Sequence, residues 1–334
     1  MVTDGLLRWY AVNHRALPWR RDRDPYRVWV SEIMLQQTRV EAVIPYYERF
    51  LAALPDVSAL ADAPDEQLLK LWEGLGYYSR VRNMKKAANQ IMERGGFPRT
   101  AAELKKLSGF GEYTSGAVAS IAFRQRVPAV DGNVLRVWAR MTRTGESIKM
   151  PSVRRRCAAD VLDAMPSDAD PGLYNQALME LGATVCTPRG PRCLLCPVRA
   201  HCEAFAAGEA EDYPIAEAQP ARPVEEFTVY LIVENGRALV RQRPEKGLLA
   251  GMWEFPHGID GDCVRELPCE ALEVRHVFTH KIWQMRGVRA ALTGSCEGVW
   301  VDKTRLAALP MNSAMEKYRQ VLLESGELTD GGAD

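Results

Sequence analysis

Four cysteines in the middle of the chain constrain its fold most, because they have to meet around one centre. They are Cys186, Cys193, Cys196 and Cys202, in the order C-x6-C-x2-C-x5-C. The x2 step places two thiolates on one turn and the longer arms bring in the other two, an arrangement typical of a cubane iron–sulfur cluster. We therefore expect one short loop that holds a [4Fe-4S] cluster.

Zinc is the main alternative occupant of this loop. Structural zinc sites usually pair their thiols in two short C-x(2–4)-C steps, and this run contains one. A disulfide framework is less favoured, because the chain opens without an apolar export segment and thiols stay reduced inside cells. The same reasoning predicts a cytoplasmic protein. The scattered thiols are interpreted as packing or surface residues: Cys157, Cys263, Cys269 and Cys296.

The charge of the chain is unevenly distributed. The 334 residues include 43 basic and 43 acidic side chains, a balance that argues against a polyanionic partner. However, residues 1–206 carry 29 Lys and Arg against 22 Asp and Glu, whereas residues 207–334 carry 14 against 21. The basic part also carries the cysteine loop, so the sequence favours a nucleic-acid partner for that part.

Apolar residues recur at helical spacing over residues 1–206. Val81, Met84 and Ala88, for example, lie three or four positions apart. Residues 207–224 are acidic, rich in Ala and Pro, and without periodicity, which is typical of a linker. The first part of the chain is therefore expected to be an all-α domain.

Beyond the linker the pattern changes to strands. An Asn235-Gly236 pair between two apolar runs is a strong hairpin signal. A helix is expected after Pro310. The strands are expected at residues 227–233, 238–240, 274–278 and 282–292. Residues 225–334 are thus expected to form a smaller α+β domain.

Two glycines flank one apolar residue at Gly109-Phe110-Gly111, between two helical patterns in residues 104–123. Such a turn exposes backbone amides at the start of the second helix, where they can bind a phosphate. It resembles the helix-hairpin-helix motif of DNA repair proteins, with Ser108 where proline is commoner. An ordinary helix–helix turn with a glycine C-cap is the alternative.

Asp131 lies just ahead of an apolar helical pattern. The plain interpretation is a helix N-cap. At such a position the positive end of the helix dipole is expected to keep a carboxylate ionised, as an active-site anion requires.

The hairpin, Asp131 and the cysteine loop occur in an order that resembles the endonuclease III superfamily of base-excision DNA glycosylases. Further motifs resemble the MutY-type adenine DNA glycosylases within it, over about residues 5–322. These motifs are LPWR at 17–20, WVSEIMLQQT at 29–38, LWEGLGYYS at 71–79, DGNV at 131–134, YNQ at 174–176, GLLAGMW at 247–253, FTH at 278–280 and LPM at 309–311.

The resemblance implies a helix-hairpin-helix glycosylase domain joined to a Nudix-like domain that recognises 8-oxoguanine. It also implies hydrolysis of the adenine N-glycosidic bond in double-stranded DNA, where adenine is mispaired with 8-oxoguanine or guanine and is flipped out of the helix. We expect a monomer. The implied parts are a six-helix barrel at about 24–131 with the hairpin at 104–123, an iron–sulfur subdomain from the N-terminus plus 132–206, and a Nudix-like domain at 225–334.

The resemblance also implies the catalytic residues. Glu32 is expected to protonate adenine at N7, and its apolar surroundings predict a raised pKa. Asp131 is expected to stabilise the sugar cation, as a counter-ion or a transient nucleophile. Asn133 is expected to orient water or the sugar, and Tyr113 to hydrogen bond near Asp131.

Other residues are implied to bind the substrate. Gln37 and Tyr77 enter the helix, with Tyr77 wedging beside 8-oxoguanine, while Gly109 and Gly111 contact the DNA backbone. The adenine pocket is implied to comprise Trp19, Arg20, Leu35 and Gln176. The loop that recognises 8-oxoguanine is implied to comprise Phe278, Thr279 and His280, where serine is usual at the middle position.

Tyr113 predicts the reaction type. Relatives that also cut the strand carry a Schiff-base lysine at this hairpin position, and another lysine site of some relatives is Leu135 here. We therefore expect a monofunctional glycosylase, with Lys105 and Lys106 as sources of weak lyase activity.

The alternatives are an endonuclease III-like glycosylase with lyase activity, a non-catalytic DNA-binding iron–sulfur protein, and a Nudix hydrolase. The last is disfavoured because Val264 occupies the first glutamate position of the Nudix catalytic box, which should begin near Gly258.

Overall fold

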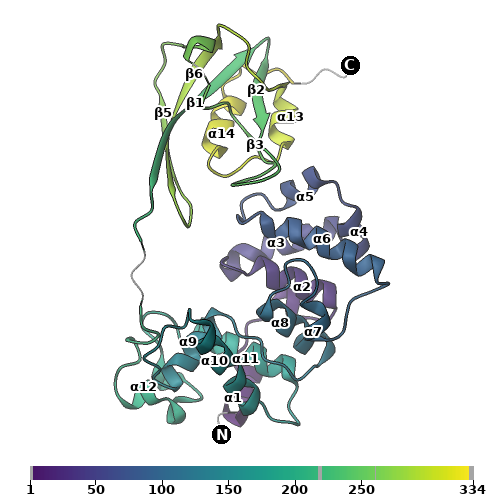
Figure 1. Ribbon diagram of the computed structural model, residues 1–334, viewed down its shortest axis with the longest axis vertical. Coiled ribbons are helices and arrows are strands. Elements are labelled where there is room, and N and C mark those ends of the chain that lie inside the picture. The colour runs from purple at the N-terminus through teal and green to yellow at the C-terminus, as the bar shows by residue number, and fades with distance from the viewer. Residues whose placement is uncertain (1–2, 217–219, 260, 331–334) are drawn as a thin grey trace. The chain divides into compact units, whose positions relative to one another are not determined.

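The computed structural model describes residues 3–216, 220–259 and 261–330 (Figure 1). It divides into two compact units, Met1–Asp62 with Arg82–Ala218, and Ala63–Val81 with Gln219–Asp334. The short segment Ala63–Val81 thus groups with the C-terminal part, although helices of the first unit flank it in the sequence. Part of the predicted linker, residues 217–219, lies outside the described residues. Within the described ranges, no helix has the length and apolar character needed to cross a membrane.

The first unit is helical, as predicted. Helix α6 continues into it from the second unit. Its helices are α1 (Thr3–Asn13), α2 (Pro25–Met34), α3 (Val40–Ala53), α4 (Val57–Asp62), α6 (Ser79–Glu93), α7 (Ala101–Leu104), α8 (Glu112–Phe123), α9 (Gly132–Met141), α10 (Pro151–Ala164), α11 (Pro171–Thr184) and α12 (Glu203–Ala206). Short 3-10 turns lie at η1 (Pro18–Arg20), η2 (Cys193–Leu195) and η3 (Arg199–His201).

One apolar core of this unit joins its N-terminal helix to helices from much later in the chain. Leu6 on α1 packs with Trp138 on α9, Cys157 on α10 and Leu181 on α11. Figure 1 shows these helices gathered together. Cys157 is fully buried, so its interpretation as a packing thiol is confirmed. This packing brings the N-terminal segment beside α11.

Helix α2 lies in the other part of the first unit, against α8 and α3. Trp29 on α2 stacks on Phe110 of the hairpin with ring centroids 5.2 Å apart. Gly109 in the hairpin has a φ of 77°, and a Cβ there would lie 2.8 Å from the Cβ of Asn83. The turn therefore requires glycine, and it directs α8 toward α2 and α11.

The second unit is a mixed sheet with helices. Its strands are β1 (Val224–Glu234), β2 (Arg237–Gln242), β3 (Trp253–Glu254), β4 (Val264–Glu266), β5 (Leu272–Val277), β6 (Ile282–Leu292) and β7 (Val299–Val301). The strand order is β3-β2-β1-β6-β4, with β5 on β6 and β7 on β2; β1 and β6 are parallel and the other pairs antiparallel. The helices are α5 (Asp65–Leu71), α13 (Lys303–Ala308) and α14 (Glu316–Glu324).

Helix α14 covers the core side of this sheet. Tyr318 and Leu322 are fully buried, and the Tyr318 hydroxyl donates to the Met285 carbonyl at 3.1 Å. Gly287 on β6 permits this contact, because a Cβ there would lie 2.2 Å from the Tyr318 ring. The sheet and the helix thus form one α+β core, as predicted.

Local strand signals in the sequence predicted this unit well. Asn235 and Gly236 have φ values of 49° and 73°, the left-handed conformations of a type I′ hairpin turn. The pair β5 and β6 is confirmed, whereas α13, which precedes Pro310, was not predicted. After Gly258, where a Nudix catalytic helix would begin, the described residues form a 3-10 turn at η4 (Gly261–Cys263) and then β4.

Candidate active site

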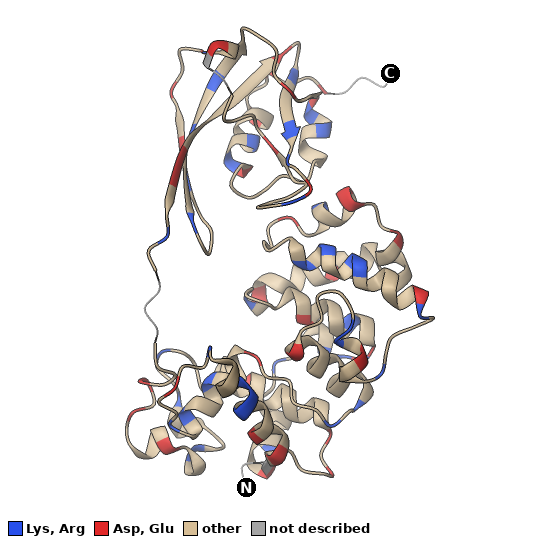
Figure 2. Ribbon diagram, in the orientation of Figure 1, with Lys and Arg blue, Asp and Glu red and all other residues tan. Residues whose placement is uncertain are grey.

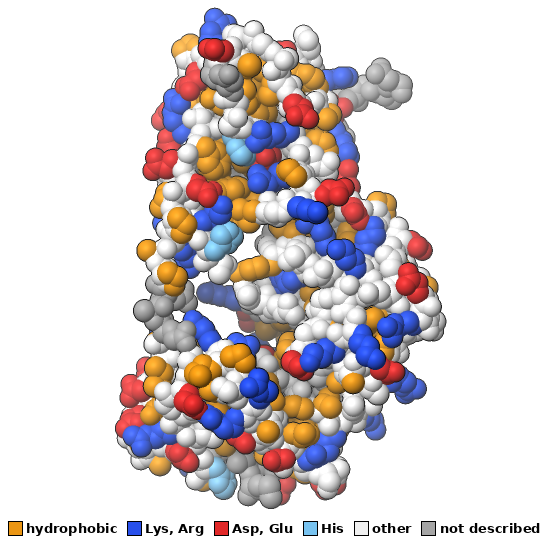
Figure 3. Space-filling view, viewed as in Figure 1, with side chains coloured by type: hydrophobic (Ala, Val, Ile, Leu, Met, Phe, Trp, Pro, Cys, Tyr) orange, Lys and Arg blue, Asp and Glu red, His pale blue; other side chains and the backbone are white. Residues whose placement is uncertain are grey.

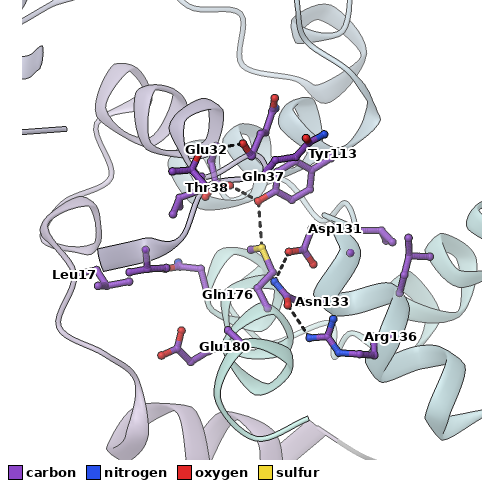
Figure 4. A pocket seen from close by; sticks show the side chains of 18 of the residues that line it. Leu17, Glu32, Gln37, Thr38, Tyr113, Asp131, Asn133, Arg136, Gln176 and Glu180 are labelled. Carbon is purple, nitrogen blue, oxygen red and sulfur yellow. Dashed lines mark hydrogen bonds between the residues drawn. The ribbon is translucent and has the colours of Figure 1, made fainter. Parts of the chain in front are cut away.

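One cavity of about 690 Å³ lies in the first unit, where η1, α2, α8, α9 and α11 meet. Residues from distant parts of the sequence face it together (Figure 4). The residues implied by sequence that line it are Trp19, Arg20, Glu32, Leu35, Gln37, Tyr113, Asp131, Asn133 and Gln176. The fold therefore brings both candidate catalytic carboxylates and the candidate adenine-binding residues to one cavity.

Glu32 on α2 is nearly inaccessible, with 6% of its surface exposed. The Tyr113 hydroxyl donates a hydrogen bond to Glu32 Oε2 and lies 3.4 Å from Met179 Sδ. Burial raises the pKa of Glu32 to about 7; the Tyr113 hydrogen bond opposes this shift and the nearby Asp131 charge adds to it. The raised pKa is as predicted. Tyr113 was expected to hydrogen bond near Asp131, and its hydrogen bond goes to Glu32.

Asp131 is the N-cap of α9, as its plain interpretation predicted. Its Oδ1 accepts from the Val134 backbone N–H and its Oδ2 from Asn133 Nδ2, both at 2.8 Å. Burial nevertheless raises the pKa of Asp131 above its ordinary value, and these hydrogen bonds lower it only in part. The helix N-terminus therefore limits the effect of burial on this carboxyl group and does not overcome it.

Asn133 has both polar atoms engaged within the protein. While its Nδ2 donates to Asp131, its Oδ1 accepts from the Arg136 guanidinium at 2.8 Å (Figure 4). Arg136 also donates to the Cys186 carbonyl at 2.8 Å and to the Gly182 carbonyl at 2.9 Å. Asn133 thus holds Asp131, and its expected role in orienting water or the sugar stays a prediction.

The backbone segment that precedes Asp131 is held by a buried side chain that was not predicted from the sequence. Asn175 on α11 is fully buried; its Oδ1 accepts from the Ala129 backbone N–H at 3.1 Å. Its Nδ2 donates to Ser120 Oγ and to the Val127 carbonyl, both at 2.9 Å. This amide fixes a segment without regular structure that ends at the candidate anion. Although Asn175 lies in the YNQ motif, nothing in the local sequence indicates these partners.

A second buried glutamate on the cavity wall was also missed. Glu180 on α11 is 1% exposed; it accepts from Arg15 Nε and from Arg20 NH2, both at 2.8 Å. Burial acts to raise the pKa of Glu180, but the hydrogen bonds from the two arginines outweigh it and lower the pKa to about 2. Tyr10 donates to Gln176 Oε1 at 3.2 Å on the same side of the cavity.

Two residues implied to enter the DNA have unusual backbone geometry. Gln37 in the first unit has a φ of 60°, and Tyr77 in the second unit has a φ of 47°. Left-handed backbone is uncommon for residues other than glycine and often occurs at functional sites. Tyr77 is 45% exposed.

The four cysteines line one small apolar cavity, together with the buried side chain of Arg140. Arg140 donates to Cys186 Sγ at 3.2 Å and to the Thr187 carbonyl at 2.8 Å. Within the described ranges, no three Cys, His, Asp or Glu side chains are grouped as they would be around one metal ion. Four thiols that face one cavity beside a buried cation match the donor set of an iron–sulfur cluster.

The implied 8-oxoguanine loop is the tight turn between β5 and β6. The Phe278 backbone N–H donates to the Lys281 carbonyl at 2.9 Å. The Phe278 ring lies between His276 and Trp283, with centroids 4.5 Å and 4.8 Å away. The Thr279 hydroxyl shares a hydrogen bond with the Tyr77 hydroxyl, so two predicted recognition residues are in contact.

Basic side chains are distributed over the first unit. They recur along the part of α6 that belongs to this unit (Figure 2), at Arg82, Lys85 and Lys86. On the face shown in Figure 3, acidic side chains are interspersed among the basic ones. The positive charge predicted for this part of the chain is therefore spread over its visible face and does not form one patch.

Comparisons with known proteins agree with this architecture. Residues 30–159 match the family model of the HhH-GPD superfamily base excision DNA repair proteins, and residues 228–320 match the NUDIX domain. A solved structure of a thermostable thymine-DNA glycosylase is similar with a TM-score of 0.54 and 26% identity, over 61% of this chain and 94% of that one. The predicted helix-hairpin-helix and Nudix-like parts are thus confirmed.

Curated relatives are similar over most of this chain. The adenine DNA glycosylase of Arabidopsis thaliana is 41% identical over 75% of this chain and 46% of its own length. That of Schizosaccharomyces pombe is 33% identical over 76% of this chain and 68% of its own length. The chain spans about half of the plant and mammalian relatives. With the pocket and both domain matches, this similarity shows that the chain belongs to the adenine DNA glycosylase family.

Proposed function

We propose that this protein excises adenine mispaired with 8-oxoguanine, or with guanine, by hydrolysing its N-glycosidic bond in double-stranded DNA. The observation that carries the proposal is the pairing of Glu32, whose pKa is about 7, with Asp131 in one cavity. A cavity of about 690 Å³ accommodates a nucleotide flipped out of the helix. The protein acts as a monomer in this proposal.

Glu32 is the general acid. Adenine leaves readily only if its ring gains a proton as the bond breaks, and a carboxyl group with a pKa near 7 is protonated in a useful fraction of molecules at neutral pH. The Tyr113 hydroxyl directs this carboxyl group. Glu32 gives its proton to N7, and the electrons of the glycosidic bond leave with the base.

Asp131 stabilises the sugar cation that remains. The cation at C1′ is short-lived in water, and a fixed anion beside it lowers the barrier to its formation. The Val134 backbone N–H and the Asn133 amide hold the Asp131 carboxylate in place without neutralising it. Water then adds at C1′ and releases one proton to the solvent, Glu32 takes up a proton again, and the product is an intact strand with an abasic site.

The reaction stops at this product because the cavity wall carries a tyrosine at the hairpin position. Tyr113 has no amine to form a Schiff base, and Lys105 is ion-paired with Glu112 outside the cavity. Borohydride trapping during turnover is expected to yield no stoichiometric enzyme–DNA adduct. Such an adduct would favour the alternative of a glycosylase with lyase activity.

A [4Fe-4S] cluster held by Cys186, Cys193, Cys196 and Cys202 fits this proposal as a structural crosslink of the loop that follows α11. Arg140 is placed to compensate the negative charge of its thiolates. No step of the proposed reaction passes through the cluster.

Phe278, Thr279 and His280 are proposed to recognise 8-oxoguanine. Replacing all three with alanine is expected to weaken the preference for adenine opposite 8-oxoguanine over adenine opposite guanine. Equal preference before and after the replacement would contradict this assignment.

Single-turnover cleavage of three duplexes tests the function directly. They carry adenine opposite 8-oxoguanine, adenine opposite guanine, and thymine glycol. We expect adenine release from the first two, faster from the first, and no reaction with the third. Thymine glycol cleavage would favour an endonuclease III-like enzyme, and no release from any duplex would favour a non-catalytic DNA-binding protein.

A further inference from the structure

The segment Ala63–Val81 contacts the C-terminal part of the chain at more than one point, within the second unit. Helix α5 lies near α13 (Figure 1), and Lys70 Nζ donates to the Ala307 carbonyl at 2.9 Å. The segment carries Tyr77, one of the implied wedge residues. The contacts that hold this segment therefore influence the direction in which Tyr77 points.

Glu73, just after α5, makes the buried contact. Its Oε1 lies 3.0 Å from both Arg319 NH1 and the Met311 backbone nitrogen, and its Oε2 lies 2.7 Å from Lys70 Nζ. Arg319 on α14 has a side chain only 7% exposed and also donates to the Leu309 carbonyl at 3.0 Å. Arg319 NH2 also pairs with Glu316 Oε2 on the same helix, so Glu73 provides one of its two carboxylate partners. Losing one partner of a buried ion pair is costly, so this contact holds the end of α5.

A second ion pair joins the same two parts of the chain at the surface. Arg305 NH1 on α13 lies 2.6 Å from Glu66 Oε1 on α5, and the two side chains are 46% and 41% exposed. Exposed pairs of this kind are screened by water and contribute little. The chain thus offers a buried pair and an exposed pair with similar chemistry.

Tyr77 lies four residues after Glu73, in a strained left-handed conformation. Such a conformation persists only where the surroundings hold it. Arg80, in the first turn of α6, donates from NH2 to the Gly76 carbonyl of this loop at 3.2 Å. At the far end, the Tyr77 hydroxyl shares its hydrogen bond with Thr279. The loop is therefore tethered to the C-terminal part on both sides of its bend, by Glu73 before it and by Tyr77 after it.

We propose that Glu73 and Arg319 are positioning residues that set the direction of the loop at residues 73–77, so that Tyr77 meets Thr279. Through Tyr77 they determine how strongly the enzyme prefers adenine opposite 8-oxoguanine. This inference rests on the proposed function. It makes α14, a helix that carries none of the implied recognition residues, part of the specificity machinery.

The first experiment compares Glu73→Gln with Glu66→Gln in the full chain. Glu73→Gln keeps an oxygen for the Met311 N–H and the size of the side chain, but removes one of the two carboxylate charges that pair with Arg319. The measured quantity is the single-turnover rate of adenine excision opposite 8-oxoguanine divided by the rate opposite guanine. We expect this ratio to fall about tenfold for Glu73→Gln and to stay unchanged for Glu66→Gln. In a Tyr77→Phe background, Glu73→Gln should cause no further fall.

Hydrogen exchange in the DNA-free protein gives a readout that does not depend on the substrate. Backbone amides at residues 74–78 should exchange faster in Glu73→Gln than in the wild-type protein, and unchanged in Glu66→Gln. Unchanged exchange in Glu73→Gln, or an equal fall in the rate ratio with and without Tyr77→Phe, would overturn the proposal. A wild-type protein without preference for 8-oxoguanine would contradict the proposed function. In that case hydrogen exchange alone would test whether Glu73 positions the loop.

Discussion

Two walls of the same cavity hold buried glutamates whose pKa values are shifted in opposite directions. On the α2 wall, Glu32 accepts a hydrogen bond from Tyr113, and its pKa is about 7. On the α11 wall, Glu180 accepts hydrogen bonds from Arg15 and Arg20, and its pKa is about 2. Both side chains are almost fully buried. The difference in pKa therefore comes from their hydrogen-bond partners. A neutral hydroxyl group does not compensate the charge of a buried carboxylate, whereas two guanidinium groups do.

This contrast separates chemistry from structure within one pocket. The wall with Glu32 carries the proposed proton donor, and the wall with Arg15, Arg20 and Glu180 joins the N-terminal segment to α11. We expect substitutions on the first wall to change the rate with little loss of stability, and substitutions on the second to change stability first.

The largest expected effect is the loss of excision in Glu32→Gln. An amide cannot donate a proton as an acid does, so the single-turnover rate should fall by roughly a thousandfold. Binding to the mispaired duplex should be retained, since no charge that contacts the DNA is removed. A variant with near wild-type rate would exclude Glu32 as the general acid.

Glu180→Gln tests the other wall. It leaves the partly buried Arg15 and Arg20 without the carboxylate that joins them, so the free energy of unfolding should fall by about 3 kcal/mol in urea titrations. Glu41→Gln is the matched control, because Glu41 is 78% exposed and lies 4.0 Å from Arg15. Equal stability of the two variants would show that the Glu180 wall is not structural.

The pH dependence of stability distinguishes the walls again. The folded pKa of Glu32, about 7, lies above its unfolded value. The contribution of Glu32 to the free energy of unfolding is therefore fully present below its unfolded pKa and is lost as the pH rises through about 7. Between pH 5 and pH 8 the wild-type protein should lose about 2 kcal/mol relative to Glu32→Gln. Parallel stability curves would mean that Glu32 is ionised in the folded protein.

Tyr113→Phe should have the smallest effect. It removes the hydroxyl that directs Glu32, and the expected loss is about fivefold in single-turnover rate. Because this hydrogen bond lowers the pKa of Glu32, its removal should move the alkaline limb of the rate profile to higher pH. A limb that moves to lower pH would show that Tyr113 stabilises the acid form.

Features encoded over a few residues could be predicted from the sequence. The Asn235-Gly236 turn needs only residues that tolerate positive φ, and the N-cap at Asp131 needs only the helix that follows it. The motifs that carry the family resemblance also indicated the candidate site residues that line the cavity, because the resemblance implies a role for each of them.

Contacts between distant residues could not be predicted in this way. Arg15 and Glu180 are 165 positions apart, and neither has an unusual neighbour in the sequence. Likewise, the LWEGLGYYS motif indicates a loop but not that Glu73 faces Arg319. For Tyr113 the sequence indicated a hydrogen bond near Asp131 but not that Glu32 is its partner, since the direction of the side chain depends on how α8 packs against α2.

The distance in sequence between Arg15 and Glu180 has a consequence for biosynthesis. A chain leaving the ribosome exposes Arg15 and Glu32 long before α11 has been made, so this wall of the cavity is the last to assemble. Until then Glu32 is a solvated, ionised carboxylate with an ordinary affinity for protons. In the proposed mechanism, Glu32 can therefore act as an acid only after burial has raised its pKa, and an incomplete chain carries the candidate catalytic residues without that shift.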